Sequence, residues 1–141
     1  IICNGDQVIA AKLTAAIADF KKRKLDGGII VFEDVHPRWS FVKCNADGLV
    51  VEAAEKRPIS RLATAGFYYF AHGRDFVKAA ERMILKDSQV EGAFYVCPAY
   101  NEMLLENARV GVFLIPRQNY FSMATPPGAQ LYSEHLKKIH H

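Results

Sequence analysis

Residues 29–32, Ile-Ile-Val-Phe, form a short run without a polar residue directly after two glycines. Such a run, rich in β-branched side chains, is typical of a strand buried on both faces of a sheet. Residues 8–24 precede it with apolar residues at helical spacing and a basic end, Lys21 to Lys24. Cations complement the dipole at the end of a helix, and a glycine such as Gly27 ends it. The sequence therefore predicts a helix followed by a buried strand.

Short apolar runs and helical segments continue to alternate along the chain. Further strands are predicted at residues 1–3, 41–43, 49–52, 64–70, 94–97 and 110–115. Further helices are predicted at residues 74–86, 98–105 and 130–139. The strands at 41–43 and 49–52 flank Asn-Ala-Asp-Gly, a hairpin turn in which the glycine accepts positive φ. This order predicts an α/β fold with a mostly parallel mixed sheet, flanking helices and one inserted β-hairpin.

The 141 residues are enough for one domain with a core of ordinary size. We predict that it spans residues 1–139, and we interpret the two histidines at 140–141 as the remnant of a purification tag. Hydrophobic residues make up 50% of the chain and charged residues 23%, which excludes disordered and coiled-coil classes.

Charge and cysteine content narrow the partners and the compartment. The formal net charge of +3 is too small to indicate a nucleic-acid partner. No apolar run approaches the roughly 18 residues that span a bilayer, so neither a signal peptide nor a membrane partner is expected. The three cysteines, Cys3, Cys44 and Cys97, are widely spaced without a CxxC pair. This pattern favours a reducing, cytoplasmic environment over a disulfide framework or a zinc site.

The first candidate site follows the apolar run at the start of the chain. The sequence begins without Met inside that run, which suggests a chain entered partway, and passes into Asn-Gly-Asp-Gln at residues 4–7. Ligands of open α/β sheets bind beyond the carboxyl ends of strands, so Asp6 is expected at the ligand edge. A single carboxylate together with substrate phosphates can hold Mg²⁺. An aspartate that caps the following helix explains the same position, and both interpretations stay open.

A charged group after the hairpin is the second candidate. Glu52, Glu55, Lys56 and Arg57 lie close together before Pro58. A carboxylate accepts hydrogen bonds from sugar hydroxyls, and an ammonium group suits a phosphate. The alternative is an ordinary solvated loop.

Aromatic residues are candidates for a cleft wall or for the core. They are Trp39, Phe67, Tyr68, Tyr69, Tyr95 and Tyr100. Because side chains alternate along a strand, Phe67 and Tyr69 are predicted on one face of residues 64–70 and Tyr68 on the other. Cys97 is predicted to be a small core residue rather than a nucleophile, since nothing in the sequence brings a histidine to it.

Several stretches taken in order carry a resemblance to a known family. They are residues 4–7, residues 36–60, which begin His-Pro-Arg-Trp-Ser and contain Ala-Glu-Lys-Arg-Pro-Ile-Ser, and residues 63–70, Ala-Thr-Ala-Gly-Phe-Tyr-Tyr-Phe. Together they resemble the sugar-1-phosphate nucleotidylyltransferases, a group that includes glucose-1-phosphate thymidylyltransferase. Residues 94–102 look like a branch often encoded with capsule and surface-polysaccharide genes. The resemblance implies part of a Rossmann-like nucleotidyltransferase fold.

The resemblance also implies a reaction and the residues that serve it. In such enzymes a sugar 1-phosphate attacks a nucleoside triphosphate and pyrophosphate leaves, while Mg²⁺ and cationic side chains neutralise charge. Asp6 matches the metal-binding aspartate, and Lys56 matches a lysine that contacts the sugar phosphate, which makes these two the implied catalytic residues. Glu55 matches a glutamate that binds sugar hydroxyls. The other implied substrate-binding residues are Trp39, Ser40, Gly66 and Tyr68.

The sequence departs from the family pattern at several places. The glycine-rich loop G-G-x-G-x-R and a following lysine, which hold the triphosphate, have no counterpart in residues 1–141 and would precede residue 1. Ala93 and Pro127 each stand where the family has a glutamate. Ser122 stands where an aspartate can serve as the second metal ligand.

These observations lead to two expectations of function. The first is the carboxyl-terminal, sugar-phosphate-binding half of a nucleotidyltransferase that uses Mg²⁺; the isolated chain is then expected to be inactive. The second is a diverged module that binds a sugar phosphate or a partner subunit without catalysis. A sheet cut at a strand leaves an unpaired edge, so association into homo-oligomers is a further expectation.

Overall fold

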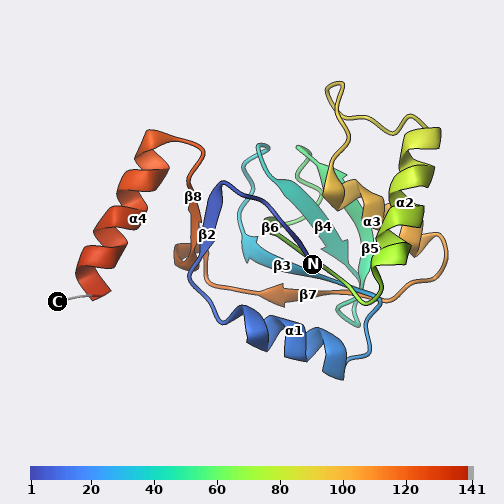
Figure 1. The fold of residues 1–141 in the computed structure, drawn as a ribbon, viewed down its shortest axis with the longest axis horizontal. Coiled ribbons are helices and arrows are strands. Elements are labelled where there is room, and N and C mark those ends of the chain that lie inside the picture. The colour runs from blue at the N-terminus through green and yellow to red at the C-terminus, as the bar shows by residue number, and fades with distance from the viewer. Residues whose placement is uncertain (140–141) are drawn as a thin grey trace.

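The computed structural model describes residues 1–139, so the histidines interpreted as a tag remnant, 140–141, lie outside the described residues. Eight strands and four α-helices alternate along the chain (Figure 1). The strands are β1 (Ile2–Cys3), β2 (Gln7–Ile9), β3 (Gly27–Glu33), β4 (Ser40–Cys44), β5 (Val50–Glu55), β6 (Leu62–Phe70), β7 (Val110–Leu114) and β8 (Tyr120–Ser122). The helices are α1 (Leu13–Lys22), α2 (Gly73–Leu85), α3 (Val96–Leu104), α4 (Pro126–Ile139) and a short 3-10 turn, η1 (Arg117–Asn119). Within residues 1–139, no helix is both long and apolar enough to cross a membrane.

The main sheet has six strands, with β5, β4, β6, β3 and β7 side by side and β1 paired with β6. The predicted α/β class, with a mixed sheet and helices around it, is confirmed. Contrary to the prediction from the sequence, the sheet is not mostly parallel. Only β3 and β7 form a parallel pair among the described strands, whereas β6 runs antiparallel to β1, β3 and β4. The inserted hairpin is present as the antiparallel pair β4–β5. Short connections between β4, β5 and β6 leave no room for the crossover that a parallel pair needs.

Helices cover both faces of this sheet. Ala16 and Phe20 of α1 pack with Ile30 and Phe67 on one face. On the other face, buried residues of α2 and α3 pack with residues of β3 and β6; they are Ala79, Met83, Cys97, Tyr100, Ile29, Tyr68 and Phe70. The predicted alternation of aromatic side chains along β6 is therefore confirmed.

Two adjacent glycines at the start of β3 allow both helical layers to approach closely. A Cβ at Gly27 would collide with the ring of Tyr100, and a Cβ at Gly28 would collide with the ring of Phe20. The Tyr100 hydroxyl donates to the carbonyl of Tyr69 at 2.8 Å and lies 3.2 Å from that of Gly28. These contacts fix α3 against β3 and β6.

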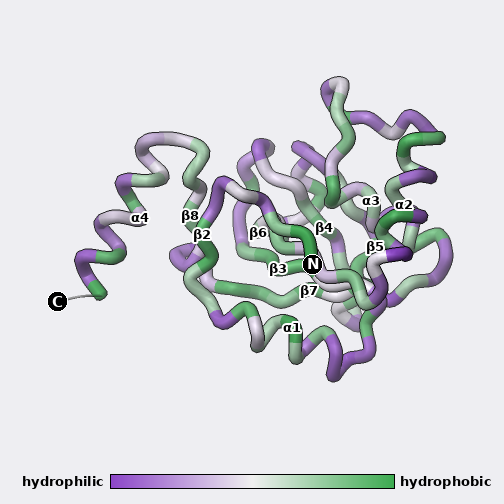
Figure 2. The backbone as a smooth tube through the Cα atoms, in the orientation of Figure 1, coloured by the Kyte–Doolittle hydropathy of each residue, from purple (hydrophilic) through white to green (hydrophobic). Residues whose placement is uncertain are grey.

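A small second sheet and α4 lie to one side of the main body (Figure 1). β2 and β8 pair antiparallel, with Gln7 opposite Ser122 and Ile9 opposite Tyr120. None of the residues of α4 is fully buried, and the helix contacts the rest of the chain mainly through β8. Figure 2 shows that β7 and the central part of β3 are hydrophobic, whereas hydrophilic and hydrophobic residues alternate on α4.

Several predicted boundaries were wrong. The last helix begins at Pro126 instead of residue 130, and the second hairpin strand extends to Glu55 instead of residue 52. The helix predicted at 8–24 begins only at Leu13, because residues 7–9 form β2 instead. The strand predicted at 94–97 is absent from the described structure, and α3 already begins at Val96. Pro98 therefore sits in the first turn of that helix, where its missing N–H has no partner to lose. A short apolar run does not distinguish a strand from a helix start.

Candidate functional site

A cavity of about 450 Å³ lies between the β1–β2 turn, the first residues of β4, the end of β5 and the loop before α3. Five of the predicted site residues line it: Asp6, Trp39, Ser40, Glu55 and Tyr68. They come from four separate segments of the chain, which the sheet brings together. Lys56 and Gly66, also predicted as site residues, are not among the residues that line it.

Ser40 and Glu55 form the polar wall of this cavity. The two residues are register partners in the β4–β5 ladder, and the Ser40 hydroxyl donates to the Glu55 carboxylate. Burial raises the pKa of Glu55, although the hydrogen bond from Ser40 and the charge of Lys56 oppose this shift. Glu55 is thus a half-buried acceptor held by one hydroxyl, rather than part of a fully solvated loop.

Tyr68 and Cys97 lie deeper in the same cavity. The Tyr68 hydroxyl lies 3.0 Å from Oγ1 of Thr64, and both residues are buried. Burial raises the pKa of Tyr68 and of the Cys97 thiol far above their ordinary values, so both groups stay protonated near neutral pH. Cys97 is a core residue, as predicted, and its thiol lacks the thiolate character of a nucleophile.

Asp6 is exposed on the turn after β1. Its backbone carbonyl accepts a hydrogen bond from the amide of Met123 at 2.8 Å, which ties the turn to the residue after β8. Asp6 does not cap α1, because that helix begins at Leu13 with Lys12 in the capping position. Of the two interpretations left open by the sequence, the helix-cap interpretation is wrong.

The surroundings of Asp6 limit the kind of metal site that it can form. Residues 1–139 contain no group of three or more His, Cys, Asp or Glu that could hold a metal ion. Glu55, the other carboxylate at the cavity wall, already accepts the Ser40 hydroxyl, and the neutral side chains of Asn4 and Ser122 also line the cavity. One carboxylate with neutral oxygens fits a Mg²⁺ ion that takes its remaining ligands from phosphate and water. The same set does not fit a site made of protein ligands alone.

Lys56 follows β5 with a positive φ of 52°. Its ammonium group pairs with the Glu91 carboxylate and lies 5.4 Å from the centre of the Tyr95 ring. The hydrogen bond to Glu91 is the main reason that the pKa of Lys56 rises to about 12. Glu91 comes from the loop between α2 and α3, so this pair connects that loop to the end of β5.

Gly66 does not line the cavity, but it holds the turn that carries Asp6. Its carbonyl accepts hydrogen bonds from the Asn4 amide at 2.9 Å and from Gln7 Nε2 at 3.0 Å. Its φ is +63°, and a Cβ there would collide with the side chains of Asn4 and Gln7. Glycine is therefore required for the Asn4–Gln7 turn to rest on β6.

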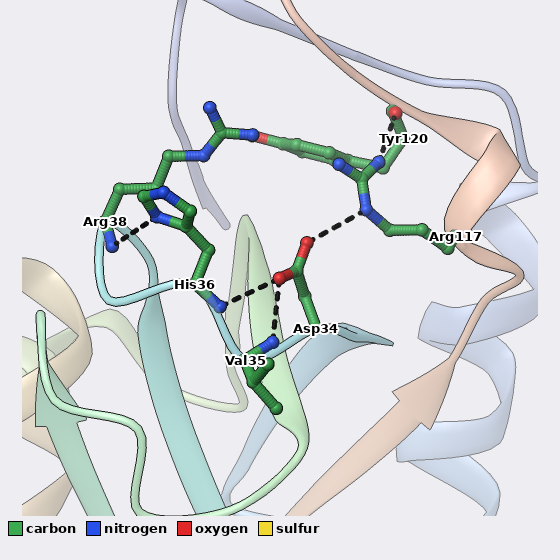
Figure 3. Close-up of polar contacts among 6 residues, drawn as sticks. All are labelled: Asp34, Val35, His36, Arg38, Arg117 and Tyr120. Carbon is green, nitrogen blue, oxygen red and sulfur yellow. Dashed lines mark hydrogen bonds and ion pairs between the residues drawn. The ribbon is translucent and has the colours of Figure 1, made fainter.

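The predicted Trp39 belongs to a cluster of aromatic and arginine side chains whose other members the sequence analysis did not single out as site residues; Figure 3 shows Arg38, Arg117 and Tyr120 of this cluster. The Trp39 and Tyr120 rings meet edge to face, with centres 5.4 Å apart, and the Arg38 guanidinium lies 4.2 Å above the Trp39 ring. Arg117 donates to the Asp34 carboxylate at 3.1 Å and to the carbonyl of Tyr120 at 3.1 Å. Figure 3 shows Arg38 and Arg117 approaching Tyr120 from different directions.

Asp34 anchors this cluster. Burial opposes ionisation of its carboxyl, but hydrogen bonds from the amides of His36 and Val35 and from Arg117 outweigh burial and lower the pKa of Asp34. Trp39 Nε1–H is buried and has no acceptor in hydrogen-bonding geometry among the described residues. Arg38 precedes the predicted Trp39 in the sequence, and this position could have indicated Arg38 as a site residue. Tyr120 lies in a three-residue strand that shows no comparable pattern.

The mixed sheet and the helices on its two faces form an α/β fold that is similar to that of solved sugar-nucleotide enzymes. A solved structure of a nucleoside-diphosphate-sugar pyrophosphorylase from Vibrio cholerae RC9 superposes with a TM-score of 0.71 and 28% sequence identity, over 83% of this chain and 48% of that one. A structure described as a glucose-1-phosphate thymidylyltransferase from Bacillus anthracis, in complex with sucrose, gives a TM-score of 0.67. Its 16% identity, over 91% of this chain and 50% of that one, supports the fold alone.

The chain spans about half the length of these two structures. No protein-family model matches the sequence, and no curated protein matches it.

Proposed function

We propose that this chain is the sugar-1-phosphate-binding part of a nucleotidyltransferase that makes nucleoside-diphosphate sugars. The observation that carries the proposal is the convergence of Asp6, Ser40 and Glu55 on one cavity in a fold of this class. The resemblance in sequence and the likeness in structure support the same assignment. The product would serve surface-polysaccharide synthesis, as the resemblance of residues 94–102 implies.

Each wall of the cavity has a distinct part in this proposal. Glu55, positioned by Ser40, accepts hydrogen bonds from sugar hydroxyls. The Trp39 ring offers an apolar face to the sugar ring, and Tyr68 forms the floor. Lys56 meets the sugar phosphate once that anion replaces Glu91 as its partner.

Transfer would require a triphosphate and a metal ion in addition. An oxygen of the sugar phosphate attacks the α-phosphorus in line, the bond to the bridging oxygen breaks, and pyrophosphate leaves. Asp6 would supply one carboxylate ligand to Mg²⁺, which neutralises charge on the phosphates. Residues 1–141 contain no glycine-rich phosphate loop, so we propose that a segment outside this sequence binds the triphosphate and that this chain alone is inactive.

Calorimetric titration of the chain with glucose 1-phosphate tests the binding step. We expect saturable binding that Glu55→Gln weakens at least tenfold, since Gln at this position donates as well as accepts and no longer offers a charged acceptor. The matched control is Glu52→Gln, on the same strand but outside the cavity lining and paired with Arg57. Equal affinity of the Glu55→Gln variant and the unchanged chain would contradict the proposal.

A second candidate function is a diverged module that binds without catalysis. It is favoured by the single carboxylate at the metal position, where Ser122 rather than an acidic residue faces the cavity beside Asp6. Pyrophosphate release by the complete gene product, measured with a panel of nucleoside triphosphates and sugar 1-phosphates, distinguishes the two. Binding without release in that assay would support the module.

A further inference from the structure

Arg38 and Arg117 converge on a second, smaller cavity of about 170 Å³ beside the one described above. Arg38, Tyr120, Ser122 and Thr125 line both cavities, so the two spaces share a wall. The two cavities are therefore direct neighbours, with these four residues between them.

The Arg38 guanidinium is held in place but carries no counterion. It lies 4.2 Å from the centre of the Trp39 ring, and among residues 1–139 its side chain makes no ion pair or hydrogen bond. The backbone amide of Arg38 donates to Nδ1 of His36 at 3.2 Å, which holds the backbone but leaves the guanidinium free. Stacking on an aromatic ring leaves the guanidinium N–H groups, five in all, available to a planar or tetrahedral anion.

Arg117 has the opposite character. Its charge is balanced by Asp34 at 3.1 Å, one of its N–H groups donates to the Tyr120 carbonyl, and its guanidinium lies 4.9 Å from the centre of the Phe32 ring. It is therefore a fixed donor group, while Arg38 supplies the uncompensated positive charge. Ser122 and Thr125 add hydroxyl groups to the wall of the small cavity.

We propose that the small cavity is an anion subsite for a phosphate or diphosphate group, with Arg38 as its main ligand and Arg117 as a supporting donor. Arginine in such a position binds phosphate oxygens through paired N–H groups. The inference goes beyond the proposed function, in which the sugar phosphate meets Lys56, a residue that lines neither cavity. A ligand with two anionic groups could occupy both spaces.

The chain provides its own reporter for this site, since Trp39 is its single tryptophan and lies directly under Arg38. Sodium pyrophosphate is titrated into the purified chain at low ionic strength with EDTA, and Trp39 fluorescence and heat are both recorded. We expect a saturable fluorescence change in the unchanged chain. Heat gives an independent affinity for variants in which the fluorescence baseline itself changes.

Arg38→Gln should weaken pyrophosphate binding at least tenfold in calorimetry. Arg38→Lys should weaken it severalfold, because an ammonium group cannot bind two phosphate oxygens side by side. The matched control is Arg74→Gln on α2, whose side chain is 82% exposed, and which should bind as the unchanged chain does. Unchanged affinity of Arg38→Gln, or an equal loss in Arg74→Gln, would overturn the subsite.

The same variants separate this inference from the proposed function. Pyrophosphate binding that depends on Arg38 in a chain that does not bind glucose 1-phosphate supports the anion subsite and contradicts the sugar-phosphate role. Glucose 1-phosphate binding that depends on Glu55, together with pyrophosphate binding that does not depend on Arg38, supports the sugar-phosphate role and contradicts the anion subsite.

Discussion

Ser40 and Glu55 lie directly opposite each other in the β4–β5 ladder, and the Ser40 hydroxyl donates to the Glu55 carboxylate. The carboxylate is half-buried, and this burial raises the pKa of Glu55. The hydrogen bond from Ser40 favours the charged form and so opposes the shift. The pair therefore couples the polarity of the cavity to the stability of the hairpin.

Ser40→Ala should destabilise the chain by about 1 kcal/mol at neutral pH, since it leaves a partly desolvated carboxylate without its donor. The pKa of Glu55 should rise further in this variant, because the hydrogen bond that lowers it is lost. Urea unfolding measures the stability and carboxyl NMR titration measures the pKa. Ser133→Ala, at an exposed position of α4, is the control and should change neither quantity.

Glu55→Gln should remove a pH dependence of stability. Because the folded pKa of Glu55 is raised, the folded chain binds this proton more tightly than the unfolded chain. The unchanged chain should thus gain stability relative to the variant as pH falls from above the raised pKa towards the ordinary glutamate value. Solvent screening keeps this gain in stability small. Urea unfolding at several pH values measures both chains. An equal pH dependence of stability in the two would contradict a raised pKa of Glu55.

Glu91→Gln should raise the affinity for glucose 1-phosphate by about two- to fivefold. The Glu91 carboxylate holds the Lys56 ammonium group, and its own side chain is 67% exposed, so solvent screens the pair and its loss should change stability little. Removing its charge frees Lys56 for a phosphate and lowers the pKa of Lys56 from about 12. Calorimetry with the exposed Glu81→Gln as control measures the change. A weaker complex would show that Glu91 contacts the sugar instead.

The alternation of strands and helices was predictable because local pattern determined it. Ile29 and its apolar neighbours indicated a doubly buried strand, and β3 lies between β6 and β7 with helices on both faces. Tyr68 and Phe67 were correctly assigned to opposite faces from the two-residue period alone. Direction was not predictable in the same way, since the antiparallel pairing of β6 with β3 depends on contacts between distant residues.

The cavity was predictable where its residues follow recognisable strands and was missed where they do not. Glu55, shortly after the hairpin strand predicted at 49–52, and Asp6, after the first strand, both line it. Tyr120 lies in β8, a three-residue strand that exists only because it pairs with β2. No periodicity is visible over three residues, so Tyr120 had no sequence signal, although Trp39 of the same cluster was predicted.

Asn101→Ala should cost about 2 kcal/mol of stability. The Asn101 side chain accepts from the amide of Ala53 at 2.8 Å and donates to its carbonyl at 2.7 Å, so it pairs α3 with the edge strand β5. Its removal leaves two backbone groups of β5 without partners. Urea unfolding should show a lower midpoint with an unchanged m value. Gln130→Ala, on the exposed face of α4, is the control, and an equal loss in both variants would contradict this role of Asn101.

Mg²⁺ binding should depend on phosphate, because Asp6 is the only carboxylate of the described cavity that is not already hydrogen-bonded to a neighbouring side chain. A hydrated Mg²⁺ ion gains little from one exposed carboxylate and needs phosphate oxygens to complete its coordination. Calorimetry should therefore detect no binding of MgCl₂ alone at millimolar concentration, and Mg²⁺ should tighten pyrophosphate binding severalfold. Asp6→Asn should abolish that gain while leaving metal-free pyrophosphate binding in place, and Asp47→Asn, in the exposed hairpin turn, should retain it. Tight binding of Mg²⁺ without phosphate would require a further carboxylate ligand and would contradict a one-carboxylate site.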